Sequence, residues 1–196
     1  MKESGVDWIG KTPEKWNVVK LKYFISISSG DALPNEKIRN TGKYPVFGGG
    51  ECIGFYEQSN TSSDELIVGR VGARCGCVTM PHCSCWATDN ALKIKTSLLL
   101  EYIYFLLTAA NLNSLNNSNA QPLITATAIK DVNVSLPSKE EQKKIASFLL
   151  CKTSKIDDNI TEIEHQLSDL KSYKSSLITE AVTGKIDLRG WEQQKE

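Results

Sequence analysis

The sequence predicts an α+β fold, in which one globular domain of short strands and helices is followed by a single long coiled-coil helix. Residues 1–137 carry short apolar runs separated by Gly, Asn and Ser clusters, a pattern typical of short strands. Residues 138–183 contain neither Pro nor Gly, and their apolar residues recur at helical steps. We therefore expect a globular domain over residues 1–137, a helix over residues 138–184 and a C-terminal tail over residues 185–196.

The length and charge of the chain restrict its class. Its 196 residues suit one domain with an appendage, and its 23 basic and 23 acidic residues leave no net charge. This balance argues against a histone-like or membrane-surface protein, because both need surplus positive charge. The apolar run over residues 97–110 is shorter than the roughly 20 residues of a membrane span, and the first residues have no signal-peptide core. We expect a cytoplasmic protein without membrane contact, in which the six cysteines are free thiols or metal ligands.

Several segments of the globular domain have a predictable secondary structure. Short apolar runs at residues 45–47, 66–68 and 132–134 predict strands. Residues 98–110 are apolar and lack Gly and Pro, which predicts a largely buried helix. The asparagine-rich residues 111–119 predict a loop, either a mobile surface loop or a polar reading surface, and the residues alone leave both open.

Both ends of the long helix carry signals of their own. Ser138 can accept hydrogen bonds from amides of the first turn, while Glu141, three residues on, reaches back to the start. Gly184 can adopt the left-handed conformation that ends a helix. At 1.5 Å per residue such a helix is about 65–70 Å long, more than a domain of this size can cover. We therefore expect something else to pack along it.

The second half of this helix predicts a coiled-coil seam. Its apolar residues follow alternating steps of four and three, with Lys174 in the one missing position. The predicted dimerisation residues are Ile156, Ile160, Ile163, Leu167, Leu170 and Leu177, continued by Ala181. Upstream, Ile145, Phe148 and Leu149 form a denser cluster that we expect to dock on the globular domain. The alternative is a helical hairpin within the chain, which is less favoured because no Gly or Pro interrupts the run.

The sequence predicts no catalytic residues. It holds only two histidines and contains no nucleophile elbow, phosphate-binding loop, dinucleotide fingerprint or nuclease-like acidic cluster with a lysine. The S-adenosylmethionine-binding and catalytic motifs of a DNA methyltransferase are also absent. We therefore expect a protein that is not an enzyme and has no cofactor in this chain.

Closely spaced cysteines are the sharpest chemical feature, and they are Cys75, Cys77, Cys83 and Cys85. Residues two apart on a strand share a face, so a hairpin turning near Met80 could gather four thiols in a tetrahedral zinc site. The spacing differs from that of the usual zinc knuckle, however, and thiols are common as small buried hydrophobes. We therefore predict no metal and keep zinc as the alternative.

Two glycine-rich segments lie beside basic or aromatic residues. Residues 48–50 are three glycines that follow Tyr44 closely, and residues 69–74 place Arg70 and Arg74 among glycines. Glycine lets the main chain approach a ligand, and backbone amides with Arg can clamp phosphate or read guanine edges. Tight turns with solvated arginines are the alternative, and the residues alone leave both open. Residues 11–43 hold seven basic and three acidic residues, a modest basic patch of the kind that is usually a solvated face.

Several stretches taken together resemble the specificity subunits of type I restriction–modification systems. The matching segments are residues 8–16, 18–21, 44–50, 53–56, 67–74, 88–91, 136–142, 145–146 and 177–187. They occur in the family's order and cover nearly the whole chain.

The resemblance implies a fold and a function. In that family a target-recognition domain is followed by a long helix, and the pattern normally occurs twice in one chain. Each domain reads half of a split DNA target, and the two helices pair antiparallel to set the spacing between half-sites. Separate modification subunits bind S-adenosylmethionine and methylate adenine, and a motor subunit is added for cleavage. This sequence contains the unit once and therefore resembles a half-length specificity subunit.

These features together predict a homodimer through antiparallel long helices. It directs methyltransferase subunits, with or without a motor and restriction subunit, to a palindromic, interrupted target in double-stranded DNA. By motif match, the candidates for DNA contact are Lys43, Tyr44, Gly48, Gly49, Arg70 and Arg74. The neutral charge is compatible with this role if the modification subunits supply phosphate contacts. The alternatives are a truncated regulatory subunit that pairs with another specificity subunit without reading DNA, and a zinc-dependent module.

Overall fold

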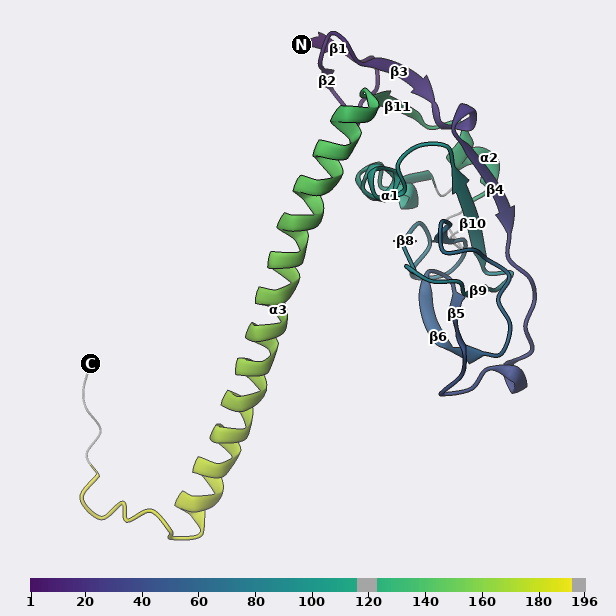
Figure 1. Cartoon of the computed structure of the whole chain (residues 1–196). Helices are drawn as coiled ribbons and strands as arrows, with labels where there is room; N and C mark the ends of the chain where they lie inside the picture. The colour runs from purple at the N-terminus through teal and green to yellow at the C-terminus, as the bar shows by residue number, and fades with distance from the viewer. Residues whose placement is uncertain (116–122, 192–196) are drawn as a thin grey trace. The chain divides into compact units, whose positions relative to one another are not determined.

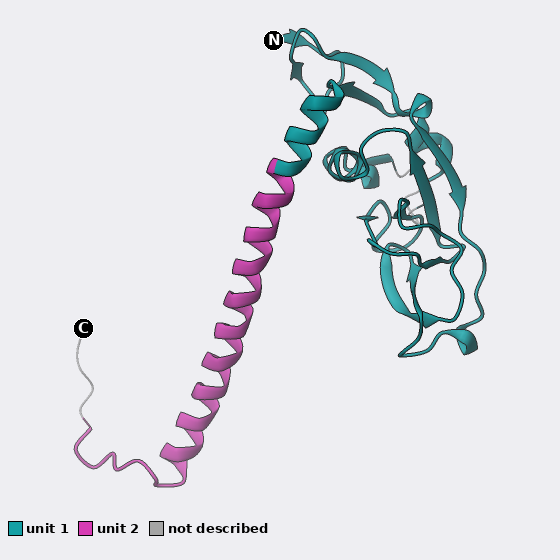
Figure 2. Ribbon diagram, viewed as in Figure 1, with its two compact units in different colours: residues 1–147 teal, residues 148–196 magenta. Residues whose placement is uncertain are grey.

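The computed structural model describes residues 1–115 and 123–191. The chain divides into two compact units, Met1–Ser147 and Phe148–Glu196 (Figure 2). The first unit holds all the strands and the short helices. The long helix α3, Lys139–Val182, begins in the first unit and continues through the second.

The main sheet of the first unit has four antiparallel strands (Figure 1). Their order is β4 (Ile25–Ser29), β10 (Ala91–Thr96), β7 (Leu66–Gly69) and β8 (Val78–Thr79). Helices α1 (Leu100–Ala109) and α2 (Ala126–Lys130) contribute to the same core. β7 is buried at all four residues, because the sheet is covered at its centre.

A second sheet carries the first glycine-rich segment. It has the order β6 (Glu51–Tyr56), β5 (Tyr44–Gly48) and β9 (Trp86–Ala87). β5 and β6 form an antiparallel hairpin, whereas β9 runs parallel to β5. A small core of Phe47, Ile67, Cys85, Ala87 and Ala91 joins this sheet to the first, since β7 and β10 contribute to it.

Two further strand pairs tie the start of the chain to the start of the long helix. β1 (Lys2–Glu3) pairs with β2 (Lys11–Thr12), and β3 (Asn17–Lys20) pairs with β11 (Asn133–Leu136). The hydroxyls of Thr12 and Ser135 are hydrogen-bonded, and the Trp16 indole donates to Glu141 Oε1 at 3.2 Å. Three 3₁₀ turns complete the unit: η1 (Leu21–Tyr23), η2 (Asn35–Lys37) and η3 (Leu112–Leu115).

The structure confirms the predicted α+β fold followed by one long helix. α3 is continuous over its 44 residues, so the hairpin alternative is not formed. At its start the Ser138 amide donates to Glu141 Oε2 at 2.9 Å and the Glu141 amide donates to Ser138 Oγ at 3.3 Å. At its end Gly184 has a φ of +73°, the left-handed conformation expected there. Both end signals are therefore confirmed.

Two local predictions were wrong. Phe148 does not dock, because its side chain is 60% exposed. The buried residues of this stretch are Gln142 and Ala146, one turn apart on α3, and the Gln142 amide donates to the Pro137 carbonyl. The asparagine-rich segment is also not a loop throughout, since η3 buries Leu112 in the core. Residues 116–119 of that prediction lie outside the described residues.

The other segments agree with expectation. The three apolar runs lie in or next to β5, β7 and β11, and α1 buries Tyr102, Ile103 and Leu107. Among the described residues, no helix is both long and apolar enough to cross a membrane.

Candidate nucleic-acid interface

The structure brings the two glycine-rich segments together. Gly49 and Gly50 form the turn between β5 and β6, with φ values of +62° and +91°. A Cβ added at Gly69, the last residue of β7, would collide with the carbonyl oxygens of Gly49 and Arg74. The two segments therefore pack backbone against backbone, which side chains at these glycines would prevent. We call residues 48–51 and 69–77 the two-loop surface.

Hydrogen bonds within the two-loop surface fix the second segment. The Gly69 amide donates to the Cys77 carbonyl and the Gly76 amide donates to the Gly69 carbonyl, both at 2.9 Å. Gly76 has a φ of +86°, and its added Cβ would meet the backbone of Asn113. Close backbone packing thus accounts for the glycines at positions 69 and 76.

Arg74 connects the two loops through an ion pair. Its Nε lies 2.8 Å from Glu51 Oε2, and the two side chains are 56% and 55% exposed. Because this carboxylate offsets the charge, Arg74 is oriented but is not an unpaired cation in the free protein.

Arg70 lies in a different environment. Its carbonyl accepts hydrogen bonds from the Ile124 amide at 3.0 Å and from the Cys75 thiol at 3.1 Å, and its amide donates to the Asn90 carbonyl. The side-chain Nε is buried and has no hydrogen-bond partner among the described residues. A buried donor of this kind is costly unless an acceptor reaches it.

Lys43 and Tyr44 lie away from the other candidates. They are at the first end of β5, whereas Gly48 and Gly49 are at its other end, about 13 Å along an extended strand. The Lys43 ammonium lies 5.1 Å from the centroid of the Tyr44 ring. Tyr44 is opposite Tyr56 in the sheet, and the Tyr56 ring meets Trp86 edge to face at 5.2 Å. The six candidates therefore form two groups rather than one.

An open cavity of about 480 Å³ beside the two-loop surface adds polar residues that were not among the six candidates for DNA contact. Its polar lining includes Arg74, Thr79, Thr108, Asn111 and Asn113. Asn111 has a φ of +46°, an uncommon conformation for a side chain other than glycine. The asparagine-rich composition was the one signal for this lining, and only the fold places it beside the glycine loops.

The hairpin that the zinc alternative requires is not formed. β8 pairs with β7 and β9 pairs with β5, so the segments around the cysteines belong to different sheets. Cys75 is buried in the main core and Cys85 in the small core, whereas Cys77 and Cys83 are exposed. Burial raises the pKa of Cys75 and of Cys85, which keeps both thiols protonated. Within residues 1–115 and 123–191, no group of three or more His, Cys, Asp or Glu side chains is placed to hold a metal ion.

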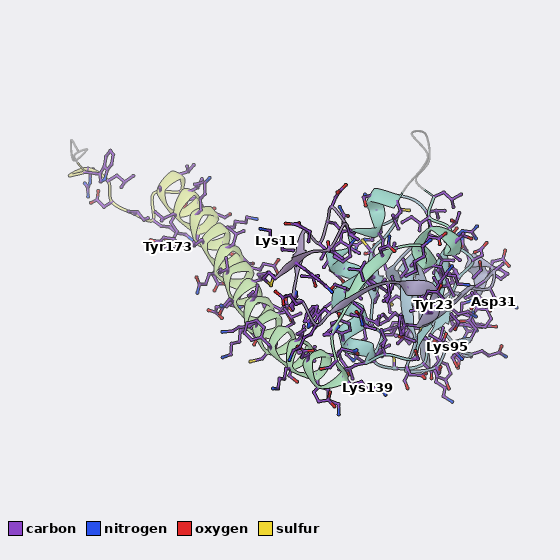
Figure 3. All side chains as sticks on the ribbon, turned by 90° about the horizontal axis from the view of Figure 1, so that it is seen from above. Lys11, Tyr23, Asp31, Lys95, Lys139 and Tyr173 are labelled. Atoms are coloured by element: carbon purple, nitrogen blue, oxygen red, sulfur yellow. The ribbon has the colours of Figure 1, made fainter. Side chains whose placement is uncertain are left out.

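The second surface is the seam of α3. Its six predicted dimerisation residues have exposures from 39% at Leu177 to 64% at Leu170. Tyr173, labelled on this helix in Figure 3, is 65% exposed. An exposed apolar stripe of this length, interrupted at Lys174, marks an interaction surface on a helix.

The fold and the two surfaces define a two-part binding protein, with a glycine-lined loop surface on a β-rich unit and an apolar seam on a long helix. The chain belongs to the family described as the type I restriction modification DNA specificity domain, whose model matches residues 13–171.

Relatives and solved structures agree with this assignment. The chain is 27% identical over 171 residues to the type I restriction enzyme EcoprrI specificity subunit of Escherichia coli, covering 86% of this chain and 42% of that protein. It is 27% identical over 194 residues to the EcoDI specificity subunit of the same organism, covering 94% and 41%. The fold is similar to the S subunit of a type I restriction–modification system from M. genitalium, with a TM-score of 0.68, 22% identity, and coverage of 87% and 49%. The chain thus spans about two fifths of the length of these curated relatives.

Proposed function

We propose that this chain is the DNA-recognition subunit of a type I restriction–modification system and itself performs no catalysis. The observation that carries the proposal is the family match, which extends over residues 13–171 and so includes the β-rich unit and most of α3. The β-rich unit reads a DNA half-site, and the partner methyltransferase subunits bind S-adenosylmethionine and methylate adenine. A motor and restriction subunit joins where the DNA is cleaved.

The assembly we propose is a homodimer formed through α3. An exposed apolar seam is stable in water only when another surface covers it, and a second copy supplies an identical seam. Two copies related by a two-fold axis carry two identical recognition units. The target is then bipartite and palindromic, with its spacing set by the paired helices.

The two-loop surface is the proposed site of DNA contact. Its glycines let the two loops pack closely, and Arg70 brings a buried donor without a described partner. Arg74 contributes after its pairing with Glu51 is exchanged for a phosphate or a base edge. Lys43 and Tyr44 make a separate contact from the other end of β5. Since the chain has no net charge, the methyltransferase subunits provide a share of the phosphate contacts.

Methylation mapping tests the function. The full chain is expressed with a cognate methyltransferase subunit in cells that lack other adenine methylation, and the methylated motif is determined. We expect an interrupted palindrome that appears only when this chain is present. A non-palindromic motif that depends on this chain alone would contradict the homodimer. The absence of any methylated motif, with an active methyltransferase subunit present, would contradict DNA recognition.

Arginine substitutions test the site. In the purified complex, we expect Arg70→Ala to weaken binding to the mapped target by about 1–3 kcal/mol and to relax specificity at one base position, if Arg70 reads a base edge. If Arg74 contacts phosphate, Arg74→Ala lowers the salt dependence of DNA binding, and it does so equally for all DNA sequences. Lys155→Ala is the matched control, because it removes a cation from α3, outside the two-loop surface. Unchanged binding and salt dependence in both arginine variants would remove them from the site.

A further inference from the structure

The seam of α3 contains one charged residue, and it restricts how two copies can pair. Lys174 occupies a seam position between Leu170 and Leu177. In a parallel pair, each seam residue faces the same residue of the other copy, so two Lys174 ammonium groups would meet inside the interface. In an antiparallel pair, Lys174 faces a different residue, and the like-charge contact disappears. A single lysine in a seam therefore selects orientation at some cost in stability.

We propose that α3 pairs with a second copy of itself in one antiparallel register, with the two-fold axis beside residue 165. This inference rests on the proposed homodimer and specifies its interface. In this register Ile163 faces Leu167 of the second copy, Ile160 faces Leu170, and Ile156 faces Lys174. The seam then extends outward, with Thr153 opposite Leu177 and Leu149 opposite Ala181.

Apolar residues beside the seam favour this register. Leu150 and Ile178 each follow a seam residue directly, so they lie on the same flank of the helix. Their side chains are 39% and 54% exposed. The proposed register places Leu150 of one copy beside Ile178 of the other, at both ends of the interface, and so covers two apolar residues that the seam alone leaves in water.

Charged residues on the same flank of the helix also favour this register. Asp157, Glu164 and Lys171 occupy the equivalent flanking positions in successive heptads. With the axis beside residue 165, Lys171 of one copy lies between Asp157 and Glu164 of the other. The one like-charge contact on this flank joins Glu164 of one copy to Glu164 of the other. Each Glu164 also lies beside Lys171 of the other copy.

The opposite flank supplies a further pair. Lys152 and Glu180 directly precede seam residues, and the register brings Lys152 of one copy beside Glu180 of the other. Two-fold symmetry makes this contact twice.

Neighbouring registers are less favourable. One copy can slide by one heptad so that the two-fold axis moves toward the start of α3. This places Asp157 against Glu164 of the second copy and loses the Lys152–Glu180 pair. A shift of one heptad toward the end of α3 places Lys171 of one copy between Glu164 and Lys171 of the other, so a like-charge contact replaces the contact with Asp157, and it separates Leu150 from Ile178. The proposed register thus combines apolar and charge complementarity on one flank with a charge pair on the other.

Distances between spin labels test the register in the full chain. The exposed cysteines Cys52, Cys77 and Cys83 are changed to Ser. One variant is labelled at the native, exposed Cys151, and the other carries Cys151→Ser with a label at Ser175→Cys, both on the outer face of α3. At 1.5 Å per residue, we expect separations along the helix axis of about 42 Å at residue 151 and about 30 Å at residue 175.

Each other outcome contradicts a different statement. Separations under about 20 Å at both positions indicate parallel helices and overturn the proposal. Changes of about 10 Å in opposite directions at the two positions indicate a one-heptad shift, which overturns the register but leaves the homodimer intact. A monomeric chain with no dipolar signal contradicts the homodimer itself, while methylation mapping still tests DNA recognition separately.

Charge reversal tests the flanking residues. We expect Lys171→Glu to weaken the dimer at least tenfold at low salt, because each copy loses two attractive contacts and gains two repulsive ones. Combining it with Asp157→Lys and Glu164→Lys should restore dimerisation to within threefold. Lys155→Glu, the same charge change on the outer face, is the control and should leave the dimer unchanged. Failure of the triple variant to recover, with a weakened Lys171→Glu dimer, would overturn the assigned contacts.

Discussion

Gly69 is the point where two loops of the β-rich unit touch. The carbonyls of Gly49 and Arg74 occupy the space that a side chain would take there. The Arg74–Glu51 ion pair then joins the outer sides of the same loops. A glycine is thus required for packing at this position, whether or not DNA also approaches it.

A single added methyl group at Gly69 should therefore be costly. We expect Gly69→Ala to destabilise the protein by about 2 kcal/mol, because backbone carbonyls cannot move as a flexible side chain can. For a protein of this size, the melting temperature should fall by about 4–8 °C in a thermal scan. Gly190→Ala, where the added Cβ meets no atom within 4 Å, is the control and should leave the melting temperature within about 1 °C. An unchanged melting temperature in Gly69→Ala would contradict the close packing of the two loops.

The start of α3 shows how one element is specified locally. Ser138 and Glu141 satisfy each other's amides, and the Trp16 indole from the first part of the chain also donates to Glu141. The hydrogen bond from the Ser138 amide, followed by that from Trp16, lowers the pKa of Glu141 below its ordinary value of 4.5. A carboxylate whose pKa is lowered by folding stabilises the folded state above its ordinary pKa, and this contribution is lost as the pH falls through the lowered value.

Acid titration should reveal this contribution. Between pH 7 and pH 3, we expect the wild-type chain to lose more thermal stability than Glu141→Gln, which has no carboxylate to protonate at that position. Circular dichroism at 222 nm measures the loss, since α3 is the longest helix of the described residues. Glu140→Gln removes a neighbouring carboxylate of the same helical turn and should behave as the wild type. Identical acid curves for Glu141→Gln and wild type would show that the cap does not stabilise the helix start.

At the scale of the whole molecule, the chain carries two surfaces with different chemistry. The two-loop surface is rich in glycine and carries Arg70 and Arg74, whereas the seam of α3 is apolar and exposed. Covering the seam gains about 25 cal/mol per Å² of apolar area, because water is excluded from it. The proposed dimerisation and the proposed DNA recognition therefore depend on different residues and can be separated by substitution.

A charge in the middle of the seam should separate dimerisation from DNA recognition. We expect Leu167→Asp to weaken dimerisation by at least 100-fold, because an unpaired charge in the interface costs about 3–5 kcal/mol. Light scattering at about 20 µM should give the mass of two copies for wild type and of one copy for this variant. Ser168→Asp places the same charge at the next, outward position and should remain a dimer. The thermal transition of the β-rich unit should be unchanged in both variants.

Local patterns in the sequence were sufficient for α3, its two end signals and its seam. Each depends on residues within one or two helical turns, where spacing alone determines which side chains share a face. The glycines beside Tyr44 and Arg70 were also recognisable from the sequence, together with the family resemblance.

The tertiary structure alone decided which distant segments meet. It joined the loop after β5 to the loop after β7, paired Arg74 with Glu51, and placed Lys43 and Tyr44 at the other end of β5. It also placed Cys75 and Cys85 in different cores, and it left Phe148 exposed, contrary to expectation. The physical reason is that strand pairing joins residues far apart in the chain, and no local periodicity specifies which strands become neighbours. The sequence by itself determined the long helix and its apolar seam, whereas the fold decided how the two-loop surface is assembled.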